Sequence, residues 1–384
     1  TNGYVTAPVC GPSRVGIITG KYQQRFGVDR NKTLNIPENV TTFPQYLEKA
    51  NYVSGLSGKT HFGRSMPTMG FHEYFAATPD PWENIYNATH DLDGNLLENV
   101  TTYDLEDYNM YRVDAETDAA VQFIDRNHNR PFFLYLPYTA PHVELEATEK
   151  YLERFPDVTD EKRLLCLAMI SAIDDGVGKI METLRKYDIE ENTMIFFISD
   201  NGAPLDSIYM EHARDGSLNI PLSGEKGTYL EGGIRVPWII YWKEQIPGGQ
   251  VMDVPVTTLD VLPTVMAAAN IKTDEKLDGL NILPTIVSKG ATPLPERNLY
   301  WYGRAQQAIR SGDWKLFRTT HNGYIRLVNL KNDIAEKNNL AEQYPGKVQN
   351  LLEELNNWQS QMNTPPAEEI HPVIESIIFR HIDD

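Results

Sequence analysis

The sequence is poor in three features, and each shortage excludes a class of protein. It has two cysteines in 384 residues, so it cannot be a disulfide-stabilised scaffold and its core must be built by packing. No apolar run comes near the ~20 residues of a membrane span, so no membrane span is expected. Its 35 Lys and Arg residues are outnumbered by 53 Asp and Glu residues, and the net charge of −18 excludes a general nucleic-acid binder.

The hydrophobic and aromatic content indicates a folded chain. At 41% hydrophobic and 10% aromatic residues, the sequence can bury enough apolar surface to exclude intrinsic disorder. Its length fits one large α/β unit of ~250 residues with a smaller partner, or two to three domains. Cys166 lies on the apolar side of a predicted helix, so we expect this thiol in the core.

Short continuous apolar runs, each followed by polar residues, predict strands. Such runs are typical of strands buried on both faces, as in a parallel sheet. They span 52–57, 131–136, 194–198 and 236–241. Helical periodicity falls at 114–127, 161–187 and 258–270. Strands that alternate with helices imply βαβ units, so we expect an α/β fold with a mostly parallel central sheet sandwiched by helices.

The composition changes near residues 288–295, where Gly, Pro and small residues predict a linker. Four closely spaced strand-like pieces follow, which favour an antiparallel meander. A helix is expected from about Tyr344 to Met362. We therefore expect two domains: a larger domain at 1–290 and a C-terminal α+β subdomain at 291–384, with an antiparallel sheet and a helix.

The most informative segment is Cys10-Gly11-Pro12-Ser13-Arg14, followed by Thr19-Gly20. Pro12 suits the first turn of a helix, where its missing N–H is not needed. Cys10 is then expected just before the helix N-terminus, where unpaired N–H groups and the helix dipole favour an anion. Taken alone, a structural cysteine at a helix cap would be the simpler interpretation.

Other motifs follow the predicted strands. Lys59 and His61 are two residues apart, a spacing that points both side chains to one face at the end of a strand. A lysine can neutralise an anionic oxygen, and a histidine can move a proton near neutral pH. Asp200 and Asn201 follow a buried strand, where oxygen ligands suit Ca²⁺ or Mg²⁺, although Asp-Asn-Gly is also a common turn.

Together these motifs resemble those of the type I, formylglycine-dependent sulfatases, a family of the alkaline-phosphatase-like superfamily. The similar segments, in the family's order, are 10–20, 58–63, 140–142, 199–202, 221–237, 308–315 and 329–333. The resemblance runs from Tyr4 to about Leu340. A single motif could arise by chance, whereas the ordered set is specific.

The resemblance implies a sulfatase that hydrolyses sulfate esters, with sulfated carbohydrate or polysaccharide as the substrate. A sulfatase-maturating enzyme would oxidise Cys10 to formylglycine (3-oxoalanine), whose hydrate offers one hydroxyl to attack sulfur and a second to expel sulfate. Ca²⁺, with Mg²⁺ as the alternative, would be held by Asp200, Asn201 and the formylglycine oxygen at position 10. Residues 1–290 would form the catalytic domain.

By the same resemblance, six residues receive catalytic roles: Cys10, Arg14, Lys59, His61, His142 and Lys226. His61 would deprotonate the second hydroxyl of the hydrate. His142 and Lys226 would help to protonate the leaving oxygen, and with Lys59 they would bind the sulfate. Arg14 would hold the formylglycine hydroxyls and the metal-site carboxylates.

Substrate specificity is expected in loops around the pocket. The candidate loops are 68–109 and 207–219, and within the second we expect His212 and Arg214 to bind substrate. Arg304 and His321 are further candidates for the rim of the pocket.

The sequence departs from the family at its beginning. The family has an Asp-Asp pair upstream of the cysteine motif, whereas only nine residues precede Cys10 here, so we expect an N-terminally incomplete sequence. A periplasmic or extracellular location is expected by resemblance alone. Two alternatives stay open: a phosphodiester or phosphonate hydrolase on the same fold, and an inactive glycan-binding relic or truncated fragment. Asn-x-Thr sequons, which also arise by chance, begin at Asn31, Asn39, Asn87 and Asn99.

Overall fold

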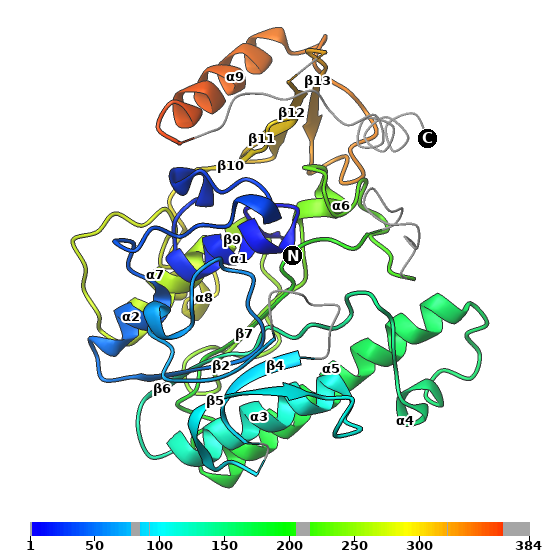
Figure 1. Cartoon of the computed structure of the whole chain (residues 1–384). Helices are drawn as coiled ribbons and strands as arrows, with labels where there is room; N and C mark the ends of the chain where they lie inside the picture. The colour runs from blue at the N-terminus through cyan, green and yellow to red at the C-terminus, as the bar shows by residue number, and fades with distance from the viewer. Residues whose placement is uncertain (1, 78–84, 92, 205–215, 321, 364–384) are drawn as a thin grey trace.

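The computed structural model describes residues 2–77, 85–91, 93–204, 216–320 and 322–363. Helices cover both faces of a central sheet, and a smaller antiparallel sheet with its own helix lies at one end of the molecule (Figure 1). The described N-terminal residues lie between these two parts (Figure 1). This arrangement confirms the predicted fold class.

The central sheet has five strands, in which β2 pairs in parallel with β3 and with β6, while β4 and β5 extend the sheet in antiparallel fashion. In order across the sheet they are β5 (Leu96–Asp104), β4 (Ile85–His90), β3 (Glu73–Ala77), β2 (Val53–Lys59) and β6 (Phe132–Tyr135). Two further pairs of strands are not hydrogen-bonded to this sheet: β7 (Ile195–Ile198) with β8 (Trp238–Tyr241), and β1 (Gly3–Tyr4) with β9 (Val256–Thr257).

The four apolar runs all form strands, β2, β6, β7 and β8, but only β2 is buried along its whole length: β6 is partly buried, and β7 and β8 differ further from the expected environment. β7 and β8 pair antiparallel, with Phe197 opposite Ile239. These two side chains are 43% and 59% exposed, so the strands are not buried on both faces. The physical reason is that an apolar run reports a preference for burial and β structure, and it carries no information on strand direction.

Two groups of helices sandwich the sheet. Alternating strand residues face opposite helix layers: Leu56 and Phe133 pack with the first group, and Val53 and Leu134 with the second. The first group is α1 (Cys10–Thr19), α2 (Phe43–Glu48) and α7 (Val261–Ala268), and the second is α3 (Arg112–Asn127) and α5 (Glu161–Lys186). The buried Cys166 lies on α5, as expected.

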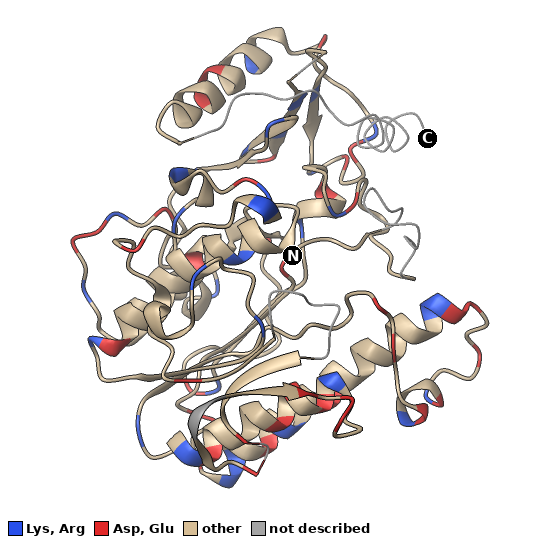
Figure 2. Ribbon diagram, in the orientation of Figure 1, with Lys and Arg blue, Asp and Glu red and all other residues tan. Residues whose placement is uncertain are grey.

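The long helices α3 and α5 lie side by side and carry charges of both signs (Figures 1 and 2). Asp160 caps α5 by accepting a hydrogen bond from the Arg163 N–H, and Arg185 and Lys186 in the last turn complement the helix dipole. No helix within the described residues is both long and apolar enough to span a bilayer. The short α-helices are α4 (Glu149–Leu152), α6 (Glu231–Ile234) and α8 (Leu283–Val287). The 3₁₀ helices are η1 (Gln23–Phe26), η2 (Asn31–Thr33), η3 (Pro67–Met69) and η4 (Thr258–Asp260).

The C-terminal strands form the predicted antiparallel meander in sequence order. They are β10 (Asn298–Tyr302), β11 (Gln306–Ser311), β12 (Trp314–Thr319) and β13 (Ile325–Asn329), followed by α9 (Pro345–Gln359). One face of this sheet packs under α9 through Leu316 and Leu355. The other face contributes Trp301 and Phe317 to a core shared with Tyr4. The division into two domains at residue 290 stays a prediction.

Candidate active site

Cys10 is the first residue of α1 and is 3% exposed, so its side chain lies inside the molecule at the helix N-terminus. Its Sγ lies 3.3 Å from Nδ1 of His61. Val9 before it is extended and no side chain caps the helix in the usual way. Cys10 therefore lies at the start of a helix as the sequence predicted, one residue further into the helix than expected.

The surroundings of Cys10 favour a negative charge. Burial alone would raise the pKa of the thiol, but the hydrogen bond with His61 and the charges of Lys59 and Lys226 outweigh it and lower the pKa to about 6. The structure thus brings four of the predicted catalytic residues together around one position. An oxygen nucleophile at position 10 would be stabilised as an anion by the same groups.

His61 reaches Cys10 by a route that strand alternation does not explain. β2 ends at Lys59, and His61 lies beyond it with a left-handed φ of 58°. The expected reason for the shared direction of the two side chains was therefore wrong, because alternation applies only within the strand. The left-handed residue turns the chain and directs the imidazole to the thiol. Such backbone conformations in non-glycine residues concentrate at functional sites.

Arg14 connects the helix to two other site segments. Its Nε donates to Asp200 Oδ2 at 2.7 Å, and its Nη1 donates to the Lys59 carbonyl at 2.6 Å. Burial raises the pKa of Asp200, but the opposing charges of Arg14, Lys59 and Lys226 lower it to about 2, so this carboxylate is charged at neutral pH.

Asp200 and Asn201 offer the donor chemistry of a hard-cation site, but only part of a full ligand set. The Asn201 Oδ1 is buried and has no hydrogen-bond partner, which fits a group that binds an absent ligand. Ca²⁺ takes 6–8 oxygen ligands. Within the described ranges, however, no three His, Cys, Asp or Glu side chains form a metal-binding group. The two residues therefore fit part of the ligand set of a divalent cation.

Lys226 and His142 reach the site from two loops. The Lys226 N–H donates to the Ala203 carbonyl at 3.1 Å, and the following Gly227 N–H donates to the Pro8 carbonyl at 2.9 Å, beside the start of α1. His142 Nδ1 lies 2.7 Å from the Val143 carbonyl. Burial and the charges of Lys59 and Lys226 lower the pKa of His142 to about 3, so its ring is neutral in the free protein.

Of the remaining residues predicted to bind substrate or line the pocket, Arg304 alone lies within the described residues. His212, Arg214 and His321 lie outside the described residues. Arg304 Nε donates to Asp29 Oδ2 at 2.5 Å, an ion pair that anchors the chain just before η2. Arg304 therefore supports a loop close to the site.

Asn31 is a site residue that the sequence did not reveal, except as one of four sequons. Its Oδ1 accepts a hydrogen bond from the Gly11 N–H at 3.0 Å, and its Nδ2 lies 3.6 Å from Cys10 Sγ. It thus satisfies a free N–H at the start of α1 across 20 residues of sequence. No local pattern signals such a contact, because it depends on how η2 folds back onto the helix.

Comparisons with known proteins identify the family of this chain. The sulfatase family model matches residues 1–271, and a model described as N-sulphoglucosamine sulphohydrolase, C-terminal, matches residues 225–363. Arylsulfatase J of Mus musculus is 28% identical, over 92% of this chain and 69% of its own length. N-acetylgalactosamine-6-sulfatase of Mus musculus is 30% identical, over 81% of this chain and 63% of its own length. The chain thus spans about two thirds of the length of these relatives.

A solved structure extends the likeness to the whole fold. Ps i-CgsB in complex with k-i-k-neocarrahexaose matches with a TM-score of 0.80 and 28% identity, over 98% of this chain and 88% of that chain. The central sheet, the C-terminal meander and the segments that meet at Cys10 all fall within the matched regions. With a family model that matches well over half of its residues, the chain belongs to the sulfatases, sulfuric ester hydrolases with the alkaline-phosphatase-like fold.

Proposed function

We propose that the protein hydrolyses sulfate esters on a carbohydrate, with formylglycine made from Cys10 as the nucleophile. The observation that carries the proposal is the convergence of Cys10, Lys59, His61 and Lys226 at the N-terminus of α1. A hydrated formylglycine at this position supplies one hydroxyl to attack sulfur and a second whose deprotonation releases sulfate.

His61 is the base in this proposal. Its Nδ1 is 3.3 Å from the side-chain atom of position 10, within reach of a proton on an oxygen bound there. The left-handed backbone at His61 fixes the direction of the ring. In a protein with formylglycine at position 10, His61 would accept the proton of the second hydroxyl and so assist the release of sulfate.

The cations bind the sulfate group. Lys59 is 4% exposed, and its burial lowers its pKa to about 8 because few solvent contacts stabilise the ammonium. A sulfate oxygen next to Lys59 and Lys226 would restore that stabilisation. The net charge of −18 does not oppose this binding, because surface charges more than ~8 Å away are screened at physiological salt.

His142 is the proposed acid for the leaving oxygen. In the free protein its ring is neutral, because burial and two neighbouring ammonium groups disfavour the imidazolium. A bound sulfate ester would place negative charge beside these groups and would favour the protonated form of His142, which would then donate a proton to the leaving oxygen.

A divalent cation, Ca²⁺ or Mg²⁺, would be held by Asp200 and Asn201, and it would supply positive charge against the charge that develops on the sulfuryl oxygens. Arg14 orients Asp200 for this task through the 2.7 Å hydrogen bond. The Asn201 Oδ1, which has no hydrogen-bond partner, would be the second oxygen ligand of the cation.

The substrate class, the maturation partner and the location belong to the same proposal. The relative at 30% identity is named for a sulfated amino sugar, and the matched structure at 28% identity contains an oligosaccharide, which together favour a sulfated carbohydrate. Conversion of Cys10 requires a sulfatase-maturating enzyme. We expect the protein in the periplasm or outside the cell.

The test combines a covalent and a kinetic measurement. The protein is produced with a sulfatase-maturating enzyme, and mass spectrometry of the peptide that contains Cys10 should show loss of the thiol and gain of an aldehyde. The same sample should release sulfate from an aryl sulfate and from sulfated oligosaccharides. An unmodified Cys10 without sulfate release would overturn the proposal, and a large preference for an aryl phosphodiester would assign the alternative hydrolase activity.

A further inference from the structure

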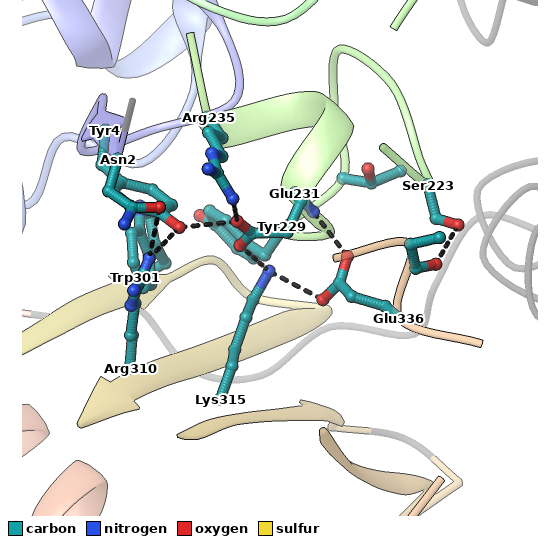
Figure 3. A network of polar contacts seen from close by, with 12 residues as sticks. Asn2, Tyr4, Ser223, Tyr229, Glu231, Arg235, Trp301, Arg310, Lys315 and Glu336 are labelled. Atoms are coloured by element: carbon teal, nitrogen blue, oxygen red, sulfur yellow. Dashed lines mark hydrogen bonds and ion pairs between the residues drawn. The ribbon is translucent and has the colours of Figure 1, made fainter. Parts of the chain in front are cut away.

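A second cluster of buried charge joins the C-terminal sheet to the rest of the protein (Figure 3). Lys315 of β12 places its Nζ 2.9 Å from Glu231 Oε1 and 2.9 Å from Glu336 Oε1. The side chains of Lys315 and Glu231 are fully buried, and that of Glu336 is 1% exposed. Glu231 begins α6, and Glu336 lies in the loop after β13. None of these residues has a place in the proposed chemistry.

Glu336 binds the main chain as well as the ammonium group. Its Oε2 accepts a hydrogen bond from the Glu231 N–H at 2.6 Å, at the start of α6. The preceding Ala335 carbonyl accepts a hydrogen bond from Ser223 Oγ at 2.5 Å. Two consecutive residues of one loop therefore hold both ends of residues 223–231, which we name the Lys226 segment.

The Lys226 segment carries one catalytic candidate and supports the metal candidates. Its Lys226 N–H donates to Ala203, two residues after Asn201. Just after it, the Gly233 carbonyl accepts a hydrogen bond from the Gly202 N–H at 3.0 Å. The backbones approach so closely that a Cβ on Gly202 would lie 1.7 Å from the Gly232 carbonyl oxygen. A displacement of the segment would therefore move the residues next to Asp200 and Asn201.

The loop that presents Glu336 has a fixed shape. Glu336 has a left-handed φ of 54°, which is unfavourable for a residue with a side chain. Its carbonyl accepts a hydrogen bond from Arg326 Nη1, and the Asp333 carboxylate accepts from the Lys337 N–H at 3.0 Å and the Asn338 N–H at 2.7 Å. These contacts hold the carboxylate toward α6 in an unfavourable conformation, which persists only where the surrounding structure imposes it.

We propose that Glu336 is a positioning residue for sulfate ester hydrolysis: it holds the Lys226 segment, and through it the Asp200–Asn201 pair, in the geometry that the reaction needs. The inference rests on the proposed roles of Lys226 and Asp200. It predicts that the loop after β13 contributes to the rate although, within the described residues, the side chain of Cys10 makes its hydrogen bonds with Asn31 and His61.

The test compares Glu336→Gln with Leu316→Ala. Glutamine keeps the shape of Glu336 but turns one acceptor oxygen into an NH₂ group, which faces a donor at either Lys315 or the Glu231 N–H. Leu316 follows Lys315 in β12 but points to the α9 side of the sheet, so its truncation lowers stability without touching the Lys226 segment. Both variants are measured well below their unfolding temperatures.

Two readouts separate positioning from loss of stability. Hydrogen–deuterium exchange should rise in Glu336→Gln within residues 200–203 and 223–231, and stay unchanged in β2 and α3. On an aryl sulfate, kcat should fall ~10-fold or more, and inhibition by inorganic sulfate should weaken. Leu316→Ala should keep kcat and sulfate inhibition within about twofold.

The outcomes are decisive in each case. Unchanged exchange in both segments, or an equal loss of kcat in Leu316→Ala at the same loss of stability, would overturn the proposal. If Glu336→Gln does not fold, Ser223→Ala removes only the hydroxyl contact with Ala335, and unchanged exchange in that variant would overturn it instead. If the wild-type protein lacks sulfatase activity, the proposed function fails, while the exchange measurement still decides whether Glu336 holds the segment.

Discussion

The two clusters of buried charge in this protein differ in how their charges are compensated. Around Cys10, the cations outnumber the anions: Arg14 is paired with Asp200, but within the described residues Lys59 and Lys226 make no ion pair. Burial, together with the charges of Arg14 and Lys226, lowers the pKa of Lys59 to about 8 against the opposing charges of Cys10 and Asp200. The cluster is therefore short of negative charge, as expected for a site that receives an anion.

Around Lys315 the compensation is local. Its ammonium lies between the carboxylates of Glu231 and Glu336, while Arg310 and Arg235 approach from the side of Tyr4 and Glu231 (Figure 3). Burial and charge alone therefore do not identify a catalytic site. What distinguishes the site around Cys10 is the pair of cations, Lys59 and Lys226, for which the described part of the chain supplies no ion-pair partner.

The largest effect is expected at the nucleophile. Cys10→Ala should reduce sulfate release by ~10³-fold or more, because the variant cannot form the proposed covalent link to sulfate. The unfolding temperature should hardly change, since alanine fits at the start of a helix. Steady-state rates and thermal unfolding measure the two quantities, and a fully active variant would show that Cys10 is not the source of the nucleophile.

In the cluster around Lys315, removal of the cation should lower the stability of the fold. Lys315→Met removes the shared cation and leaves two buried carboxylates without it, which should lower the free energy of unfolding by about 3–5 kcal/mol. Denaturant unfolding measures the loss. A stable variant would mean that Glu231 and Glu336 are satisfied by the remaining donors, and the contrast between the clusters would disappear.

The same Lys-to-Met change at the candidate active site should lower catalytic activity rather than stability. Lys59→Met should lower kcat/KM on an aryl sulfate by ~10²-fold, because one group that stabilises the transferred sulfate is lost. Its stability should be unchanged or higher, since a buried ammonium without a partner is removed. Parallel measurements of rate and unfolding on the Lys59 and Lys315 variants test the opposite pattern directly.

The smallest effect is a dependence of stability on pH. Burial raises the pKa of Glu336 to about 7 from its ordinary 4.5, with Lys315 opposing and Glu231 adding to the shift. The folded protein therefore binds this proton more tightly than the unfolded chain does. The associated stability is present below about pH 4.5 and is lost as the pH rises through about 7.

Glu336→Gln cannot titrate, so the difference in unfolding temperature between this variant and the wild type should shift in favour of the variant from pH 5 to pH 8. The groups that face Glu336 are Lys315, Glu231 and the Arg326 guanidinium at its carbonyl. A constant difference across this pH range would show that Glu336 does not titrate in it.

Sequence patterns predicted most of the fold because the spacing of apolar residues indicates both which residues are buried and whether they form a helix or a strand. The helices at α3, α5 and α9 and the C-terminal meander lie where the periodicity placed them. The antiparallel direction of β8 against β7 was not predictable, since Trp238–Tyr241 is equally apolar in either direction. Strand direction is set by the path of the chain between strands, which a local pattern does not contain.

The candidate site was predictable where a motif carries its own chemistry, as at Cys10 and Asp200. The role of the left-handed turn at His61 was not, because a histidine in that conformation has no signature in the sequence. The contact of Glu336 was even harder to predict from the sequence, since its partner Glu231 lies 105 residues earlier in the chain. Contacts of this kind become visible only when the C-terminal loop is seen against α6.

The long-range contacts of Tyr4 and Val5 can form only after the C-terminal strands have been synthesised. Trp301 Nε1 donates to the Val5 carbonyl across 296 residues, and Arg310 bonds Tyr4 from a similar separation. The segment just before Cys10 therefore gains its final neighbours only after most of the chain has been synthesised. Because Cys10 is 3% exposed in the finished fold, the modification that we propose for it would need access to the thiol before these contacts form.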